Sequence, residues 1–240
     1  MARVCVDSTF FNIDGSGNLT FKRESVGLQR MLVFQGGGTT STFKKADFPG
    51  LTRVRVRVVG GGGGGAGANA DTGEAVARAG GGSGGYSESV LNAADLGATE
   101  TINVGAGGVG GGGNEDGEAG QSSSFGGFVV ALGGGGSAAS MPSGTGPATA
   151  SGGYAAGRGT GQIRLEGGNG GAAVRHGPQA GISGFGGNSI LGAGGQGVGS
   201  DQNGVTGSLY GGGGSGATSN GASHNGGAGA SGVVLVELFY

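Results

Sequence analysis

The placement of glycine constrains this chain more than any other feature of its sequence. Seven of its 69 glycines precede Gly60 and none follows Gly232, which leaves 62 in the segment between. Glycine contributes no side chain to a core and loses more backbone freedom on folding than any other residue, so an ordinary helical or Rossmann-type enzyme domain is excluded. Collagen is excluded too, because glycine does not recur at every third position and the chain has 4 prolines. What remains is a disordered glycine-rich polymer or a fold built from glycine backbone.

The glycines of this segment gather in runs separated by stretches of variable length. In the left-handed, three-residue helix called polyglycine II, a glycine run has no internal hydrogen bonds, so its N–H and C=O groups point outward. Such helices can bond to one another in every lateral direction, and six residues at about 3.1 Å each span roughly 19 Å, one layer of a stack. The runs lie at 60–65, 80–85, 105–113, 133–136, 167–171, 192–199, 211–216 and 226–232.

Two segments that enclose the runs have the pattern of β-strands. Residues 53–59 alternate arginine and valine, which predicts a strand with Val54, Val56 and Val58 on a buried face and Arg53, Arg55 and Arg57 on a solvated one. Residues 233–238 form a second, strongly apolar strand that would be an aggregation hazard if unpaired. We therefore expect these strands to pair and to close a glycine-rich domain over 49–240.

Residues 1–48 read as a separate, small β-rich region. Short runs of β-branched and aromatic residues at 2–6, 19–23 and 28–34 are separated by turn residues such as those at 14–17. Residues 1–59 hold 9 basic and 4 acidic side chains, whereas 60–240 hold 4 and 11. The fold class predicted is all-β with irregular glycine-rich structure, in which short strands frame a stack of polyglycine II helices, with essentially no α-helix.

Disorder is the alternative to this stack, because abundant glycine and serine without a period is typical of a flexible chain. Strand-like segments at 86–91, 99–104 and 125–132 lie between the glycine runs and would be costly to leave exposed. These apolar segments favour an ordered fold.

No motif in the sequence supports catalysis or a cofactor, so we expect no catalytic residues and no enzyme. Gly105, Gly107 and Gly110 match the dinucleotide fingerprint, but about eight such matches are expected by chance at this glycine density, and residues 111–117 cannot open a helix. Serine is abundant without an elbow motif or a base partner. A net charge of −2 gives no support for nucleic-acid binding by the whole chain.

Metal sites and membrane insertion have no support either. His176 and His224 lack a nearby cysteine or a histidine at ligand spacing, so both are interpreted as surface residues. The acidic group Glu115, Asp116 and Glu118 could attract a calcium ion, but it matches no known ligand pattern and a solvated loop is favoured. The single cysteine, Cys5, cannot form an internal disulfide, and no apolar run has transmembrane length or the form of a signal peptide.

The order of these segments resembles the glycine-rich domain of bacteriophage tail proteins. The resemblance covers about 190 residues. Among such proteins, the sequence is most similar to minor tail or tail-fibre proteins of phages that infect actinobacteria such as Streptomyces. Its specificity lies in the ordered series: VRVRVVGGGGGG after Pro49-Gly50, GGGSGGYSESVL (80–91), ETINVGAGGVGGGG (100–113), SSFGGFVVALGGGG (123–136), GGNGG (167–171) and GAGASGVVLVEL (227–238).

This resemblance implies a virion protein at the tail tip that helps to recognise the host surface. Related adhesins stack polyglycine II helices into a sandwich and present loops at its distal end, and tail fibres are commonly trimers, so a homotrimer is expected. The implied partners are other tail proteins, with residues 1–48 docking to the tail, and a host glycan or teichoic acid. Aromatic and guanidinium groups between the runs are the candidate receptor-binding residues: Tyr154, Arg158, Arg175, His176, Phe185 and Tyr210.

Alternatives remain open both for the candidate residues and for the protein as a whole. For each candidate residue, a role as loop anchor or spacer is favoured over receptor contact, since the loops are poor in aromatic residues. The whole protein could be a structural tail-tip element without receptor contact. A third alternative, an ice-binding protein of the polyglycine type, predicts a regular Gly-x-x spacing and disulfides, and neither is evident in the sequence.

Overall fold

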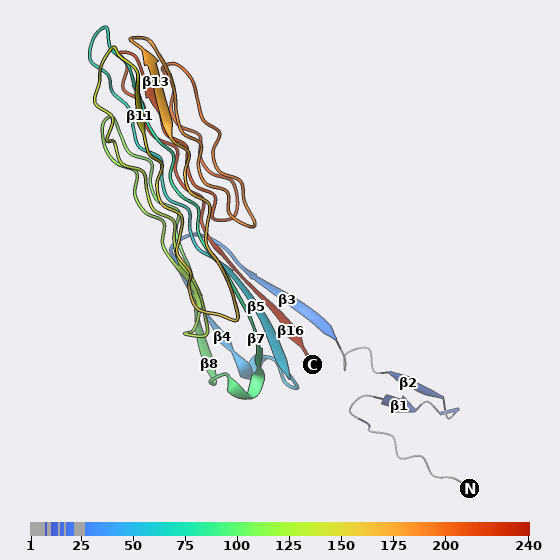
Figure 1. Cartoon of the computed structure of the whole chain (residues 1–240). Helices are drawn as coiled ribbons and strands as arrows, with labels where there is room; N and C mark the ends of the chain where they lie inside the picture. The colour runs from blue at the N-terminus through green and yellow to red at the C-terminus, as the bar shows by residue number, and fades with distance from the viewer. Residues whose placement is uncertain (1–7, 9–10, 14, 17, 22–26) are drawn as a thin grey trace.

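A computed structural model describes residues 8, 11–13, 15–16, 18–21 and 27–240 of the chain. It is all-β: among these residues the helical segments are two 3-10 turns, η1 (Lys45–Asp47) and η2 (Ala93–Asp95). The segments after β4 (Thr39–Lys44) run back and forth between a β-sandwich, which holds the C-terminus, and a distal end, through a long bundle of chain passes without sheet structure (Figure 1). The fold class expected from the sequence is confirmed.

A five-stranded antiparallel sheet forms one layer of the sandwich, and its core strands are the two that the sequence singled out. The valines of β5 (Arg53–Val59), Val54, Val56 and Val58, are fully buried, because period-two alternation turns them to one face. The sheet order is β12-β7-β5-β16-β3, and β16 lies antiparallel to β5 along its whole length. The strands are β3 (Leu28–Phe34), β5 (Arg53–Val59), β7 (Tyr86–Asn92), β12 (Ile163–Leu165) and β16 (Val233–Phe239).

A four-stranded sheet of order β10-β9-β8-β4 forms the second layer. Its inward residues include Phe43, Ile102 and Phe125, which pack with the valines of β5 and with Leu238 in one apolar core. The rings of Phe43 and Phe125 meet edge to face, with centroids 5.5 Å apart. The strands are β4 (Thr39–Lys44), β8 (Thr99–Val104), β9 (Ser123–Phe125) and β10 (Val129–Ala131).

The bundle begins where β5 runs into the pass 60–66, and its hydrogen bonds have a period of three residues. The amides of Gly60 and Gly63 donate to the pass 80–85, those of Gly61 and Gly64 to 117–121, and those of Gly62 and Gly65 to 226–232, at N···O distances of 2.8 to 3.1 Å. A β-strand bonds to neighbours on two sides with a period of two. Here, three successive amides bond to three different neighbouring passes, and the pattern repeats every three residues. This is the arrangement of polyglycine II.

The carbonyl groups of the same pass also bond to three different neighbours in turn, and these are not the passes that accept from its amides. They accept hydrogen bonds from the amides of passes 134–137, 108–111 and 214–217. The pass 60–66 is thus surrounded by six others. The passes 78–85 and 211–217 are enclosed in the same way, and the three inner passes contact one another. Outer passes complete the bundle at 105–111, 117–121, 132–137, 152–157, 167–171, 183–187, 193–198, 204–208 and 226–232.

The inner pass requires glycine because carbonyl groups lie where side chains would begin. A Cβ atom built on any residue from 60 to 65 would lie 2.0 to 2.1 Å from a neighbouring carbonyl oxygen, closer than real Cβ contacts come. An outer pass needs glycine where it faces the backbone of a neighbouring pass: Gly117 and Gly120 point at the inner pass, whereas Glu118 between them is exposed. The pass 117–121 therefore has a local Gly-x-x spacing, contrary to the expectation that the chain lacks one.

The distal end holds short strands that join the loops between passes. A three-stranded sheet has the order β11-β13-β14, and β15 pairs with β6. Small apolar side chains, including Val76, Met141 and Ala173, form a second core beneath them. The strands are β6 (Val76–Ala77), β11 (Ala148–Ala150), β13 (Ala173–Gly177), β14 (Ala180–Ile182) and β15 (Thr218–Ser219).

The expected division at residue 48 does not separate the sheets. Within the region assigned to 1–48, β3 pairs with β16 and β4 pairs with β8, so residues 28–44 join both layers of the sandwich. The expected strand at 19–23 is present as β2 (Leu19–Phe21), which forms a hairpin with β1 (Phe11–Ile13). The expected strand at 2–6, together with Cys5, lies outside the described residues.

Candidate functional site

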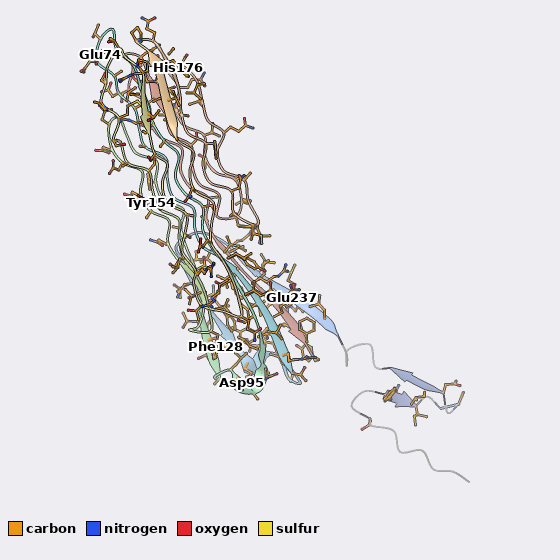
Figure 2. All side chains as sticks on the ribbon, in the orientation of Figure 1. Glu74, Asp95, Phe128, Tyr154, His176 and Glu237 are labelled. Atoms are coloured by element: carbon orange, nitrogen blue, oxygen red, sulfur yellow. The ribbon has the colours of Figure 1, made fainter. Side chains whose placement is uncertain are left out.

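Loops between the passes form the distal end of the molecule, farthest from the sandwich (Figure 1). Figure 2 shows Glu74 and His176 at this end, with Asp95 and Phe128 at the opposite end. We call the following segments the distal loops: 67–77, 112–116, 138–147, 172–182, 199–203 and 218–225. The distal loops lie outside the close packing of the bundle, so they have room for side chains larger than that of glycine.

A buried arginine, Arg78, ties three distal loops together. Its Nε donates to the carbonyl of Gly67 at 2.8 Å, its Nη1 to the carbonyl of Met141 at 2.5 Å, and its Nη2 to Oδ1 of Asn114 at 2.6 Å. Asn114 in turn accepts from the amide of Asn69 and donates to its carbonyl. Burial lowers the pKa of Arg78, and the nearby charge of Asp116 partly opposes this. The fixed fork of a guanidinium suits it to hold three acceptors from separate loops.

A second arginine, Arg175 on β13, holds two of the same loops from the other side. Its Nε donates to the carbonyl of Gly146 at 2.6 Å, and its Nη1 donates to the carbonyls of Ala75 and Pro142 at 3.0 and 2.6 Å. The side chain is buried. Within the described part of the chain, neither Arg78 nor Arg175 has a carboxylate at ion-pair distance. Both guanidinium groups therefore serve the loop backbones, which fixes the shape of the distal end.

The exposed charges of the distal loops are predominantly acidic. Nε2 of His224 lies 3.1 Å from Oδ1 of Asp201 and joins two of the loops. The backbone amide of Asn220, and then His224, lower the pKa of the Asp201 carboxyl against the opposing effect of its burial. The carboxylates of the distal loops are Asp71, Glu74, Glu115, Asp116 and Asp201.

The structure does not bring the six predicted binding residues together. His176 is exposed in the distal loops, whereas its neighbour Arg175 is turned inward as a loop anchor. Tyr154 is 84% exposed and projects from the side of the bundle (Figure 2), and Phe185 is exposed on another outer pass.

The remaining two predicted residues lie toward the sandwich. Arg158 forms an exposed ion pair with Glu166 at 3.1 Å. The hydroxyl of Tyr210 donates to Gln35 at 2.7 Å, and its ring packs against a small cluster of Val59, Tyr86 and Val233. The geometry gives Tyr210, like Arg175, a structural contact, and it leaves His176 as the predicted residue exposed at the distal end.

A group of charged side chains on the outer face of the five-stranded sheet was not anticipated. The arginines of β5, predicted to be simply solvated, form ion pairs with glutamates from both neighbouring strands: Nε of Arg55 lies 2.6 Å from Oε1 of Glu88, and Arg57 pairs with Glu237. The hydroxyl of Tyr86 donates to Glu88. The sequence alone shows only the alternation of Arg and Val, since the glutamates lie 33 and 180 residues away from the arginines along the chain.

Burial, followed by the hydrogen bond to Glu88, raises the pKa of Tyr86 to about 12. A phenol whose pKa is higher when folded keeps its proton while the unfolded chain loses it, so its contribution to stability is present below pH 10 and declines as pH rises through 12. We expect the free energy of unfolding, measured by urea melts at each pH, to fall between pH 10 and 12 more steeply in the wild type than in Tyr86→Phe. Equal slopes would contradict this role of Tyr86.

The carboxyl of Glu88 has the opposite dependence on pH. Burial, the largest single influence, raises its pKa, but the hydrogen bonds from Arg55 and Tyr86 and the charges of Arg55 and Arg57 together outweigh burial and lower it. Its contribution to stability is therefore present above the pKa of the unfolded glutamate and is lost in acid.

Neither a metal centre nor a membrane span is found in the described residues. No three histidine, cysteine, aspartate or glutamate side chains there are placed to hold an ion together. No helix in that part of the chain combines the length and the apolar character needed to cross a bilayer. The glycines of the discounted dinucleotide match, Gly105, Gly107 and Gly110, form an outer pass of the bundle, with no helix after them.

Comparison with known families agrees with the architecture. The family model described as a glycine-rich domain matches residues 36–239. This match begins just before β4 and ends with β16, so it includes the four-stranded sheet, the bundle and every strand of the five-stranded sheet except the edge strand β3. A search of curated proteins finds no match to the chain. By the extent of the family match, the chain belongs to the glycine-rich domain family.

Proposed function

We propose that this protein is a non-enzymatic tail protein of a bacteriophage that infects actinobacteria, a minor tail or tail-fibre protein at the tail tip that contributes to adsorption. The proposal rests on the resemblance of the ordered glycine runs to such tail proteins. One structural observation carries it further: the bundle separates the sandwich from distal loops that two buried arginines hold in a fixed shape. Preformed loops bind without the entropic cost of ordering them.

The chain enters and leaves the bundle at the same end. β5 leads into it, and β16 receives the chain beside β5 on its return. The sandwich end is therefore suited to attachment and the distal loops are suited to face the host.

The charge of the distal loops favours one receptor class over another. Asp71, Glu74, Glu115, Asp116 and Asp201 are all carboxylates, and the positive charges of this end are buried on Arg78 and Arg175. A polymer of phosphate groups, such as a teichoic acid, meets repulsion at such a surface. We propose that the receptor is a neutral polar glycan of the cell surface.

Binding of the purified chain to host cells tests this function. We expect the chain to bind susceptible cells, to block phage adsorption, and to be competed by neutral wall polysaccharide and not by purified teichoic acid. His176→Ala should weaken cell binding about tenfold. Tyr154→Ala, a substitution on the side of the bundle, is the matched control and should leave binding unchanged.

Three results would count against the proposal in different ways. Failure to bind any susceptible strain at micromolar concentration would favour a purely structural tail-tip role. Competition by teichoic acid alone would overturn the receptor class. Loss of binding in Tyr154→Ala with none in His176→Ala would place the contact on the side of the bundle.

A further inference from the structure

The two outer faces of the sandwich differ in polarity, although both are exposed to solvent. On the four-stranded sheet the outward residues are polar, as a water-facing sheet requires: Thr40 and Asn103 bond across the strands, and Asn103 bonds to Ser124. On the five-stranded sheet, the outward positions carry large apolar side chains. Met31, Val33, Val90, Ile163 and Leu165 are each between 44% and 50% exposed.

These apolar residues share one face by register. Met31 lies opposite Glu237 and Val33 opposite Leu235, Val90 opposite Arg55, and Ile163 opposite Glu88. The set therefore extends over the full width of the sheet, from edge strand β3 to edge strand β12. Val90, Ile163 and Leu165 lie on one side of a central band of charged residues, and Met31 and Val33 lie on the other. Large exposed apolar side chains gathered on one face mark an interaction surface.

The charges of this outer face indicate what would cover it. Arg55 has 41% of its side chain exposed, whereas its partners Glu88 and Glu237 have 12% and 9%. Arg53, on the same side of β5, is exposed. An approaching molecule thus meets guanidinium groups, with the carboxylates beneath them. A second copy, presenting the same face, would bring arginines against arginines, which is unfavourable.

We propose that the outer face of the five-stranded sheet binds another protein, whose contact surface combines apolar side chains with carboxylates. Methionine, tyrosine and arginine, all present on this face, are enriched at protein interfaces, and lysine, which is absent from its strands, is depleted there. Carboxylates on the partner supply the charge complement for Arg53 and Arg55. The inference does not depend on what the distal loops bind, and it places attachment at the end opposite to them.

A display library of disulfide-closed hairpin peptides, panned on the immobilised full chain, tests the chemistry of this partner. We expect enriched peptides to carry apolar residues with Asp or Glu. Their affinity should fall about tenfold for Val33→Lys and for Ile163→Lys, which remove apolar contact, and for Arg53→Glu, which reverses the exposed charge. Thr42→Lys and Thr101→Lys place the same new side chain on the polar outer face of the other sheet and should leave affinity unchanged.

Each other result overturns the proposal. Enrichment of basic or uncharged peptides, or equal loss of affinity in the two sets of lysine variants, would show that this face has no such preference. Sedimentation of the chain alone identifies a different occupant: self-association that Val33→Lys or Ile163→Lys abolishes would assign the face to a second copy.

Discussion

Gly63→Ala should unfold or strongly destabilise the bundle. The added Cβ would lie 2.1 Å from the carbonyl oxygen of Gly135 and 2.4 Å from its carbon, and both belong to a pass that is itself bonded on several sides. Because backbone atoms on all sides are fixed, relief requires separation of the passes. We expect a loss of at least about 3 kcal/mol in the free energy of unfolding, measured by urea melts.

Gly127→Ala is the matched control for this prediction. Gly127 lies in the turn between β9 and β10, and a Cβ there would meet nothing within 4 Å. The same substitution should change stability by no more than about 1 kcal/mol, with stabilisation expected from the reduced entropy of the unfolded chain. Similar melting of the two variants would contradict the close packing of the inner pass.

Arg78→Met should release the distal loops while the sandwich stays folded. Methionine keeps an apolar stem but leaves the carbonyls of Gly67 and Met141 and the amide oxygen of Asn114 without this donor. Asn114 is exposed and keeps its hydrogen bond from the amide of Asn69, so two buried carbonyls are left unsatisfied. At about 1–3 kcal/mol for each of them, we expect a loss of about 2–6 kcal/mol in the stability of the distal end.

Hydrogen exchange resolved by segment measures this effect. The segments 67–77, 112–116 and 138–147 should lose protection together, because the same side chain contacts all three. Arg158→Met removes an exposed ion pair and should change stability by less than about 1 kcal/mol. Independent behaviour of the three segments in Arg78→Met would show that this arginine does not couple them.

The sequence predicted the parts of the fold that local pattern determines. The alternation at 53–59 and the apolar run at 233–238 gave both central strands, and they pair as expected. The glycine run at 60–65 predicted a polyglycine helix, because such a helix turns its N–H and C=O groups outward, where neighbouring passes can bond to them. Outer passes such as 117–121 escaped notice because only every third residue there must be glycine, and Glu118 had been interpreted as part of a loop.

The candidate site was less predictable, since burial in this fold depends on loops distant in the sequence. An arginine in a glycine-rich segment looks the same whether it faces a ligand or three carbonyl groups. Its residue type makes Arg175 a predicted binding residue and gives no reason to single out Arg78, although both anchor loops through partners 11 to 100 residues away along the chain. The pairing of β3 and β4 with strands on the other side of the expected boundary at 48 could not be predicted for a related reason: contacts with strands far along the chain have no local signal.

Amide exchange of the glycine-labelled chain tests the central claim that the glycine runs are an ordered, hydrogen-bonded bundle. With ¹⁵N-glycine, the amides of 60–65 can be followed by NMR after transfer to heavy water. Each of them donates to a neighbouring pass, so all six should be protected to the level of the β5 and β16 amides. Exchange of 60–65 at the rate of an unfolded chain, while the sandwich stays protected, would contradict the bundle and restore the disordered interpretation.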